Sequence, residues 1–243
     1  AYEALVRPLT VQHAWAYWDF SCTGKPEAQD VVLDTEEQLS DIHASASVYA
    51  ALLRWREDVE DRPLLARQLQ LLLPEYRKAQ VDEDLRKRLI RLSLKIEETW
   101  SLFRPELGGE RVSSNELDRI LLEESDDERR REAWQATRAI GSRVQDRVRS
   151  LVDLRNQQAQ QLGFSDYYAL ALDDEAMSPE TIGVLLEELC DKTDLAWARL
   201  KESLDAEHAA RRGKSPEELM PWDFDDRFLQ SLPRHDPGVS LDA

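Results

Sequence analysis

The four histidines are the residues best suited to bind a catalytic metal, and their spacing argues against that role. They are His13, His43, His208 and His235. A helix presents two imidazoles to one zinc ion when the histidines are four residues apart, as in H-E-x-x-H, and no two of these are. The Glu-x-x-His spacing of di-metal helical bundles is also absent. Asp205 precedes His208 by three residues, but one such pair on a charged helix is usually a solvent-exposed contact. The sequence therefore predicts no metal ligand in this chain.

Other catalytic groups have no better support. No G-x-S-x-G motif is present, and neither Cys22 nor Cys190 has a histidine close by in the sequence, which leaves spatial neighbours open. Adjacent acids such as Glu36 and Glu37 diverge by about 100° on a helix, so they do not converge on one reacting atom. His43 lies on an apolar helix face, which favours a hydrogen-bonded boundary residue over a catalytic one. We therefore predict no catalytic residue here and assign no substrate-binding residue.

Composition restricts the class of protein. The 243 residues carry a formal net charge of −17, with 42% hydrophobic and 33% charged residues, as in a folded, soluble helical protein. A surface this acidic repels phosphate backbones and anionic lipids, so nucleic acid and membranes are poor partners. The charge serves solubility, or alternatively an acidic cleft for cationic peptides. Two distant cysteines and no signal-peptide pattern favour a reducing, cytoplasmic location.

The sequence of the first half of the chain predicts several helices, separated at proline and glycine residues. We expect a short helix over 10–20, a loop over 21–34 and a capping box at Thr35-Glu-Glu-Gln38 that opens a helix ending near Pro63. A short helix over 64–73 should stop at Pro74, and Asp82 should cap a longer helix that ends near Arg104-Pro105. Residues 106–112, with a Gly-Gly pair, form the one candidate hairpin.

The second half predicts two long helices. Capping boxes begin at Ser113 and Ser125, and the second opens a helix of about ten turns that ends at Gly163. Ser178-Pro179-Glu180 opens another long helix that ends at Gly213. An apolar stripe should face the core in this second helix: Ile182, Leu185, Leu186, Leu189, Trp197, Leu200 and Leu204. Four tryptophans in or beside such stripes favour core packing over a ligand cage: Trp55, Trp100, Trp134 and Trp197.

Together these elements predict an all-α fold. We expect an elongated multi-helix body with long antiparallel helices and a small hairpin within 106–112, formed as a single domain over residues 1–243.

Several segments, in this order, resemble zinc peptidases related to angiotensin-converting enzyme and to the oligoendopeptidase F and thimet oligopeptidase group. The segments are an opening helix over 9–25 with Trp15, Trp18 and Thr23-Gly24-Lys25; Phe103-Arg104 and Gly109; Trp134 with Ile140-Gly141; Leu154-Arg155-Asn156, Ala159, Leu162-Gly163-Phe164 and Tyr167-Tyr168; Pro221-Trp222-Asp223; and Phe228-Leu229-Gln230.

The resemblance implies one half of a peptidase without its catalytic motif. Members of this family bind zinc through H-E-x-x-H, which is absent from these 243 residues. The chain would then form the N-terminal, channel-wall part of a metallopeptidase that hydrolyses oligopeptides, with zinc held elsewhere in the intact enzyme. Its partners would be a peptide substrate and either the missing catalytic half or a second copy. The alternative function is a non-catalytic helical scaffold or interaction module.

The resemblance also draws attention to two pairs of polar and aromatic residues. Arg155 and Asn156 lie in a long packed helix, which favours buried hydrogen bonding over substrate contact. Trp222 and Asp223 follow Pro221 and could line a cleft, although structural anchoring is the stronger expectation.

Overall fold

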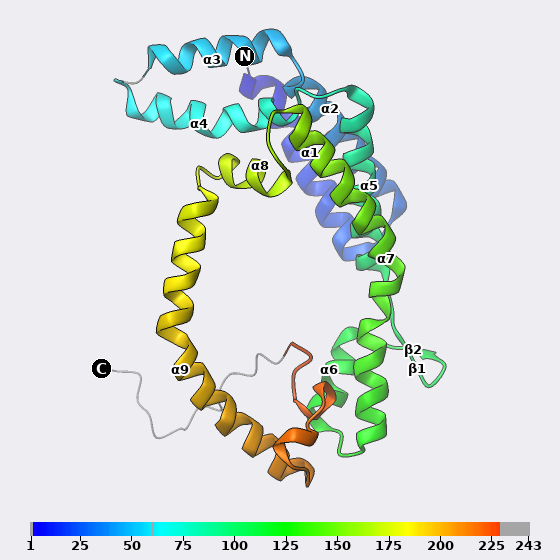
Figure 1. The fold of residues 1–243 in the computed structure, drawn as a ribbon. Helices are drawn as coiled ribbons and strands as arrows, with labels where there is room; N and C mark the ends of the chain where they lie inside the picture. Colours follow the sequence, from blue (N-terminus) through cyan, green and yellow to red (C-terminus); the bar gives the residue numbers. More distant parts are fainter. Residues whose placement is uncertain (1, 60, 229–243) are drawn as a thin grey trace, which may run out of the picture. The chain divides into compact units, whose positions relative to one another are not determined.

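The computed structural model describes residues 2–59 and 61–228. In these residues nine α-helices and one two-stranded sheet form the regular structure, so the predicted all-α class is confirmed (Figure 1). Two short 3-10 helices, Pro216–Glu218 and Pro221–Asp223, follow the last α-helix. Within the described part of the chain, no helix is both long and apolar enough to cross a membrane.

The chain groups into two compact units, which are described separately. Unit 1 comprises Ala1–Leu102 and Val144–Val184, and unit 2 comprises Phe103–Arg143 and Leu185–Ala243. Two long helices, α7 (Asp127–Gln161) and α9 (Pro179–Arg212), contribute residues to both units. The expectation of a single domain over residues 1–243 stays a prediction.

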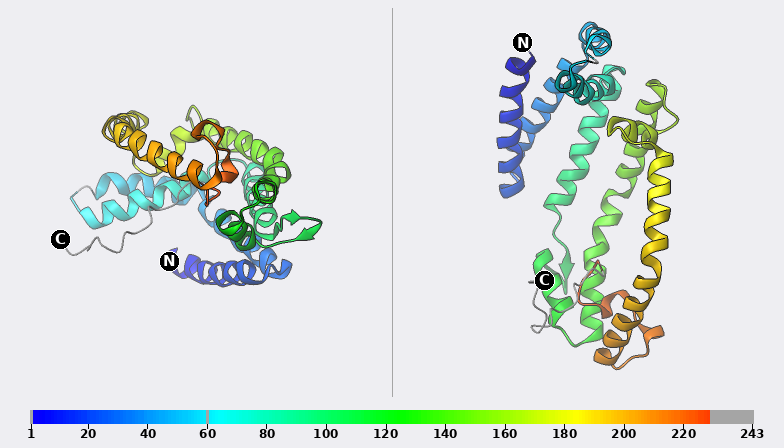
Figure 2. Two further views of the ribbon diagram at one scale, coloured as in Figure 1. Left: turned by 90° about the horizontal axis from the view of Figure 1, so that it is seen from below. Right: turned by 90° about the vertical axis from the view of Figure 1, so that its left-hand side faces the viewer.

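Unit 1 is built from paired helices. Its elements are α1 (Tyr2–Thr23), α2 (Pro26–His43), α3 (Ala46–Asp58), α4 (Pro63–Lys78), α5 (Glu83–Leu102), the second part of α7, and α8 (Tyr167–Asp174). Helices α1 and α2 lie side by side, as do α3 and α4 (Figures 1 and 2). Leu52, Leu73 and Tyr76 form a buried cluster between α3 and α4. The aromatic and aliphatic spacing of these helices thus supplies the core of this end of the unit.

The predicted loop over 21–34 is wrong. Only Gly24 and Lys25 separate α1 from α2, because Gly24 adopts φ +67 and Pro26 occupies the first turn of α2. Thr35 therefore lies inside α2 instead of capping it. Its side chain is fully buried, and its hydroxyl lies 2.8 Å from the Val31 carbonyl and 2.9 Å from the Val32 carbonyl. A threonine hydroxyl can bond to carbonyls of its own helix, so a sequence with capping-box spacing does not always start a helix.

Two predicted helix ends also differ from the structure. The helix expected to run to Pro63 is interrupted near Ala44, and Ser45 caps α3 by accepting a hydrogen bond from Val48 N. Pro74 does not stop α4, which continues to Lys78. A proline in a helix removes one hydrogen bond, and here the buried Leu73 and Tyr76 on either side hold the helix against the core.

The cap of α5 and the hairpin that follows α5 were predicted correctly. Asp82 caps α5, since its Oδ1 accepts Leu85 N at 2.8 Å. Strands β1 (Glu106–Leu107) and β2 (Glu110–Arg111) pair antiparallel around Gly108 and Gly109. Both glycines have positive φ, +62 and +85, which two-residue hairpins of this kind require.

Unit 2 packs α6 (Ser114–Glu123) against the first part of α7. Ser113 caps α6 by accepting Glu116 N at 3.1 Å, as predicted. The cap of α7 is Asp126 and not Ser125, because the Glu124 carboxylate binds the main-chain N–H groups of both residues and holds them in a turn. A buried cluster joins the hairpin, α6 and α7: Leu107, Leu117, Ala133 and Ala136.

The long helix α9 begins and ends as predicted but does not bury its apolar stripe. Ser178 accepts Thr181 N at 3.0 Å at the start, and Gly213 has φ +64 at the end. The stripe residues from Leu185 to Leu200 are exposed, so their predicted core position is wrong. Trp55, Trp100 and Trp197 are likewise exposed, whereas Trp134 is half-buried with its ring 5.8 Å from that of Trp222. Helical periodicity identifies an apolar face but not the element that covers it.

Candidate functional site

A pocket of about 370 Å³ lies within unit 1, between four helices and the start of a fifth. Helices α2, α4, α5 and α7 form its walls, and Tyr167 contributes from the start of α8. Its charged and titratable lining residues are Glu36, His43, Glu75, Lys78, Arg86 and Arg155. This is within the volume range of small-ligand sites, which combine apolar walls with a few polar groups.

Arg86 is a buried cation in this lining. Its side chain is 8% exposed, and Nη1 donates to Ser40 Oγ at 2.8 Å and to Asp41 Oδ1 at 3.0 Å. Its buried Nε has no hydrogen-bond partner within the described residues. Arg86 was not predicted from the sequence, because it follows the apolar Leu85 within a helix and no motif surrounds it.

Arg155 and Asn156 lie on the α7 side of the pocket. The guanidinium of Arg155 lies 4.9 Å from the centre of the Tyr167 ring, a cation–π distance, and it makes no ion pair within the described residues. Asn156 Oδ1 accepts Tyr167 N at 3.0 Å and so fixes the start of α8. The hydrogen bond predicted for this pair is confirmed for Asn156, while Arg155 is left able to bind an anionic group in the pocket.

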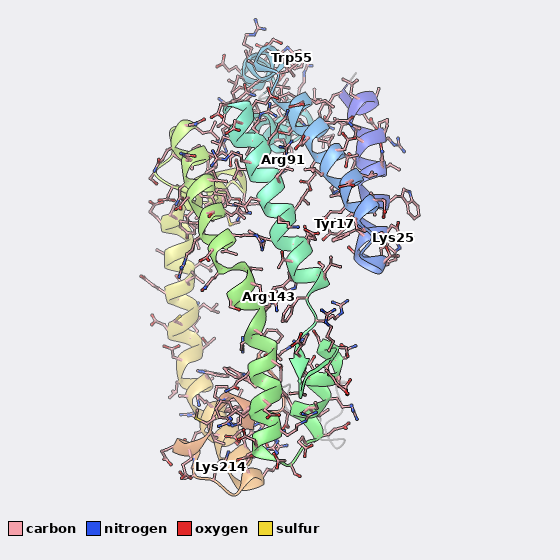
Figure 3. The ribbon with its side chains drawn as sticks, turned by 90° about the vertical axis from the view of Figure 1, so that its right-hand side faces the viewer. Tyr17, Lys25, Trp55, Arg91, Arg143 and Lys214 are labelled. Carbon is pink, nitrogen blue, oxygen red and sulfur yellow. The ribbon has the colours of Figure 1, made fainter. Side chains whose placement is uncertain are left out.

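Burial shifts the pKa values of two pocket residues of α2, Glu36 and His43. Burial, and then the charge of Glu97, raises the pKa of Glu36. Burial lowers the pKa of His43, whose Nε2 lies 2.9 Å from the Tyr2 hydroxyl. His43 is therefore the hydrogen-bonded boundary residue that its position predicted. Nearby, Tyr17 of α1 donates to Glu97 of α5, which ties two helices of this unit together (Figure 3).

The three histidines that the structure describes do not form a zinc site. His13 lies 3.2 Å from the Thr35 hydroxyl, and His208 is buried against Arg211 and the Phe224 ring. In the part of the chain that the structure describes, no three His, Cys, Asp or Glu side chains gather as a metal site. His235 lies outside the described residues. The donor set that is present therefore does not fit a zinc ion, and the predicted lack of metal ligands in the whole chain stays a prediction.

Trp222 and Asp223 anchor the segment after α9 within unit 2. Asp223 is fully buried, and its carboxylate accepts Lys214 Nζ at 2.7 Å and Met220 N at 2.8 Å (Figure 3). Arg130 Nε donates to the Trp222 carbonyl at 2.8 Å. The structural role expected of these two residues is thus what their contacts show. Of the segment that follows, Leu229 and Gln230 lie outside the described residues.

In a comparison with protein families, residues 1–194 match the peptidase M2 family model, angiotensin-converting enzyme. The chain belongs to the angiotensin-converting enzyme family. The match includes α1 to α8 and the first half of α9, and hence every residue that lines the pocket. Neither the curated proteins nor the solved structures gave a match.

Membership makes the chain part of a zinc-dependent metallopeptidase family. The likeness to the oligoendopeptidase F and thimet oligopeptidase group stays a prediction. Pro221-Trp222-Asp223 lies beyond residue 194, so the family match does not extend to that element.

Proposed function

We propose that these residues form part of the substrate-channel wall of a zinc-dependent peptidase of the angiotensin-converting enzyme family, which hydrolyses peptide bonds in oligopeptides. The family match over residues 1–194 is the observation that carries the proposal. The zinc ligands and catalytic groups belong to residues other than these 243, which contain no H-E-x-x-H. Peptide substrates are the expected partners, and nucleic acid and membranes are not.

The pocket of unit 1 supports the proposal that these residues contact peptide substrates. Arg155 offers a guanidinium with no carboxylate partner in the described residues, which suits a peptide carboxylate. Lys78 and Arg86 also line the pocket, but each is paired with a carboxylate. In a chain with a net charge of −17, Arg155 is therefore the lining cation that the described residues leave without a carboxylate partner, which favours an anionic group. A cytoplasmic location is also part of the proposal, supported by the exposed, unpaired thiols of Cys22 and Cys190.

The first experiment tests whether zinc binding and peptide hydrolysis require residues other than these 243. Purified residues 1–243 should bind no stoichiometric zinc and should not cleave an internally quenched oligopeptide, whereas the product of the complete reading frame should do both. Zinc-dependent hydrolysis by residues 1–243 alone would contradict the proposal. A complete product that neither binds zinc nor cleaves peptides would favour the non-catalytic scaffold instead.

The second experiment tests whether Arg155 contacts the substrate as part of the channel wall. In the complete enzyme, Arg155→Gln should raise KM for short peptides about 5- to 30-fold with little change in kcat, because one charge-assisted contact to bound substrate is lost. Arg149→Gln is the matched control, since Arg149 is an exposed residue of the same helix, paired with Asp146. Equal KM values for wild type and Arg155→Gln would remove Arg155 from the substrate site.

A further inference from the structure

Three charged side chains in the lining of the unit 1 pocket have binding capacity that the described residues do not use. They are Glu36 of α2, Arg86 of α5 and Arg155 of α7. Glu75 and Lys78, which also line the pocket, form an ion pair with each other at 3.5 Å. Charged groups that stay unsatisfied inside a pocket are the ones that a ligand can satisfy.

Glu36 is a partly buried carboxylate without a cation. Within the described residues its side chain forms no ion pair and accepts no hydrogen bond, whereas the adjacent Glu37 pairs with Arg91 at 2.7 Å. Burial, and then the charge of Glu97, raises the pKa of Glu36. A bound ammonium group would oppose both effects, so it is the partner that this carboxylate lacks.

The two arginines supply the opposite charge. Arg86 is 8% exposed, and its Nη1 donates to Ser40 and Asp41, while its Nε is buried without a partner among the described residues. The Arg155 guanidinium lies 4.9 Å from the centre of the Tyr167 ring and forms no ion pair in the same part of the chain. Guanidinium groups bind carboxylates through parallel hydrogen bonds, so the unused donors suit a carboxylate.

Glu36 and Arg86 lie close enough for one small molecule to reach both. Arg86 Nη1 is 2.8 Å from the Ser40 hydroxyl, and Ser40 follows Glu36 by four residues on the same face of α2. This spacing is about 6 Å along the helix axis. No ion pair joins Glu36 to either arginine within the described residues. A molecule that carries an ammonium and a carboxylate a few bonds apart would therefore satisfy both charges.

We propose that the unit 1 pocket binds a small zwitterion, a free α-amino acid or a dipeptide, with its ammonium on Glu36 and its carboxylate on Arg155 and Arg86. The volume of about 370 Å³ suits a ligand of one or two residues. The source of the ligand rests on the proposed function, because hydrolysis of oligopeptides yields amino acids and short peptides. Apolar side chains in the lining favour an aliphatic ligand: Leu39, Leu89 and Ile90.

The first test is isothermal titration calorimetry with L-leucine and with leucyl-leucine. The proteins are residues 1–243 and the complete protein, treated with a chelator to prevent hydrolysis. Both should bind at least one ligand, and the tighter ligand identifies the occupant as amino acid or dipeptide. Its N-acetylated form lacks the ammonium and its C-terminal amide lacks the carboxylate, so each should bind about tenfold or more weakly. No binding of either zwitterion, or equal affinity for the zwitterion and both derivatives, would overturn the proposal.

The second test assigns each charge to a residue. Glu36→Gln should remove the preference for the zwitterion over its N-acetylated form, and Arg155→Gln should remove the preference over its amide. A general loss of folding would weaken all ligands alike, so a change in preference reports a specific contact. Glu37→Gln and Arg149→Gln are the matched controls, from the same helices but outside the pocket lining, and should keep both preferences. Unchanged preferences in the two pocket variants would contradict these assignments and the proposal with them.

The third test separates this site from the rest of the enzyme. Binding by residues 1–243 that is lost in the complete protein would show that another part of the protein fills the pocket, and would overturn the proposal. Zinc-dependent hydrolysis by a complete protein that binds neither zwitterion would also overturn it and leave the proposed function in place. Binding by a complete protein that neither holds zinc nor cleaves peptides would support the site and remove the proposed function.

Discussion

Arg130 is the largest side chain that is completely buried within the described residues, and it is held by main-chain carbonyls instead of a carboxylate. It donates to the carbonyls of Leu121, Glu124, Trp222 and Phe224. Burial, together with the nearby charge of Arg212, lowers its pKa. The planar, multiply donating guanidinium is the one side chain that can serve four acceptors at once. Arg130 therefore fixes the segment after α9 to α6 and α7 within unit 2.

Arg130→Lys should lower the free energy of unfolding by about 2 kcal/mol, because an ammonium reaches fewer of these carbonyls and leaves buried acceptors unpaired. Urea denaturation followed by tryptophan fluorescence measures the change. Arg131→Lys is the matched control, since Arg131 is exposed and its ion pair is with Glu128 on its own helix. This substitution should change stability by no more than about 0.5 kcal/mol. Equal midpoints for the two variants would contradict the role given to Arg130.

His208 makes the stability of unit 2 depend on pH. Burial first, and then the charge of Arg211, lowers its pKa. Arg211 can only donate, so the His208 Nδ1 that it approaches at 3.1 Å must be unprotonated. The unfolded state then binds protons more readily than the folded state. The stability contributed by neutral His208 is complete above the unfolded pKa of about 6.5 and is lost as pH falls from there toward the lower folded pKa.

His208→Asn keeps an acceptor for Arg211 but cannot titrate. Between pH 7 and pH 5.5 (values that bracket the unfolded pKa of about 6.5), the unfolding midpoint of the wild type should fall more steeply than that of the variant. Urea midpoints at matched ionic strength would show the difference in slope. Parallel curves would mean that His208 does not carry this acid sensitivity.

At the scale of elements, the sequence predicted helix caps and the hairpin well, but it predicted poorly which helix faces are buried by other elements. The caps at Asp82, Ser113 and Ser178 and the Gly-Gly hairpin were found because a few adjacent residues determine each. Thr35 failed because its hydroxyl bonds within a continuing helix. The pocket was not predicted at all, since it needs the relative placement of four helices, which no single helix encodes.

The two prolines of α4 show this difference directly. Pro63 is at the helix start, where it favours helix formation, and Pro74 lies inside, where packing overrides it. Pro74→Ala should raise the free energy of unfolding by about 1–3 kcal/mol by restoring a hydrogen bond to the Gln70 carbonyl. Pro63→Ala should lower it by about 0.4–1 kcal/mol, because the unfolded chain gains freedom. Differential scanning calorimetry would measure both, and destabilisation by Pro74→Ala would show that the native helix is shaped around the proline.

At the scale of the whole molecule, residues 184–203 of α9 differ from every other long helical stretch described, since none of their side chains is buried or half-buried. Segments with few buried contacts open locally at low free-energy cost. Helix α5, by contrast, buries Leu85, Arg86 and Leu94. The two helices should therefore differ in how readily they open to solvent.

Hydrogen exchange of peptides covering 186–200 should be faster than exchange of peptides from α5 when residues 1–243 are studied alone. The main-chain hydrogen bonds of 186–200 lie in a helix without buried side chains, so they open without the loss of packed contacts that opening of α5 requires. Mass spectrometry of exchanged peptides measures both rates. Equally slow exchange of the two segments would show that α9 is stable without further contacts.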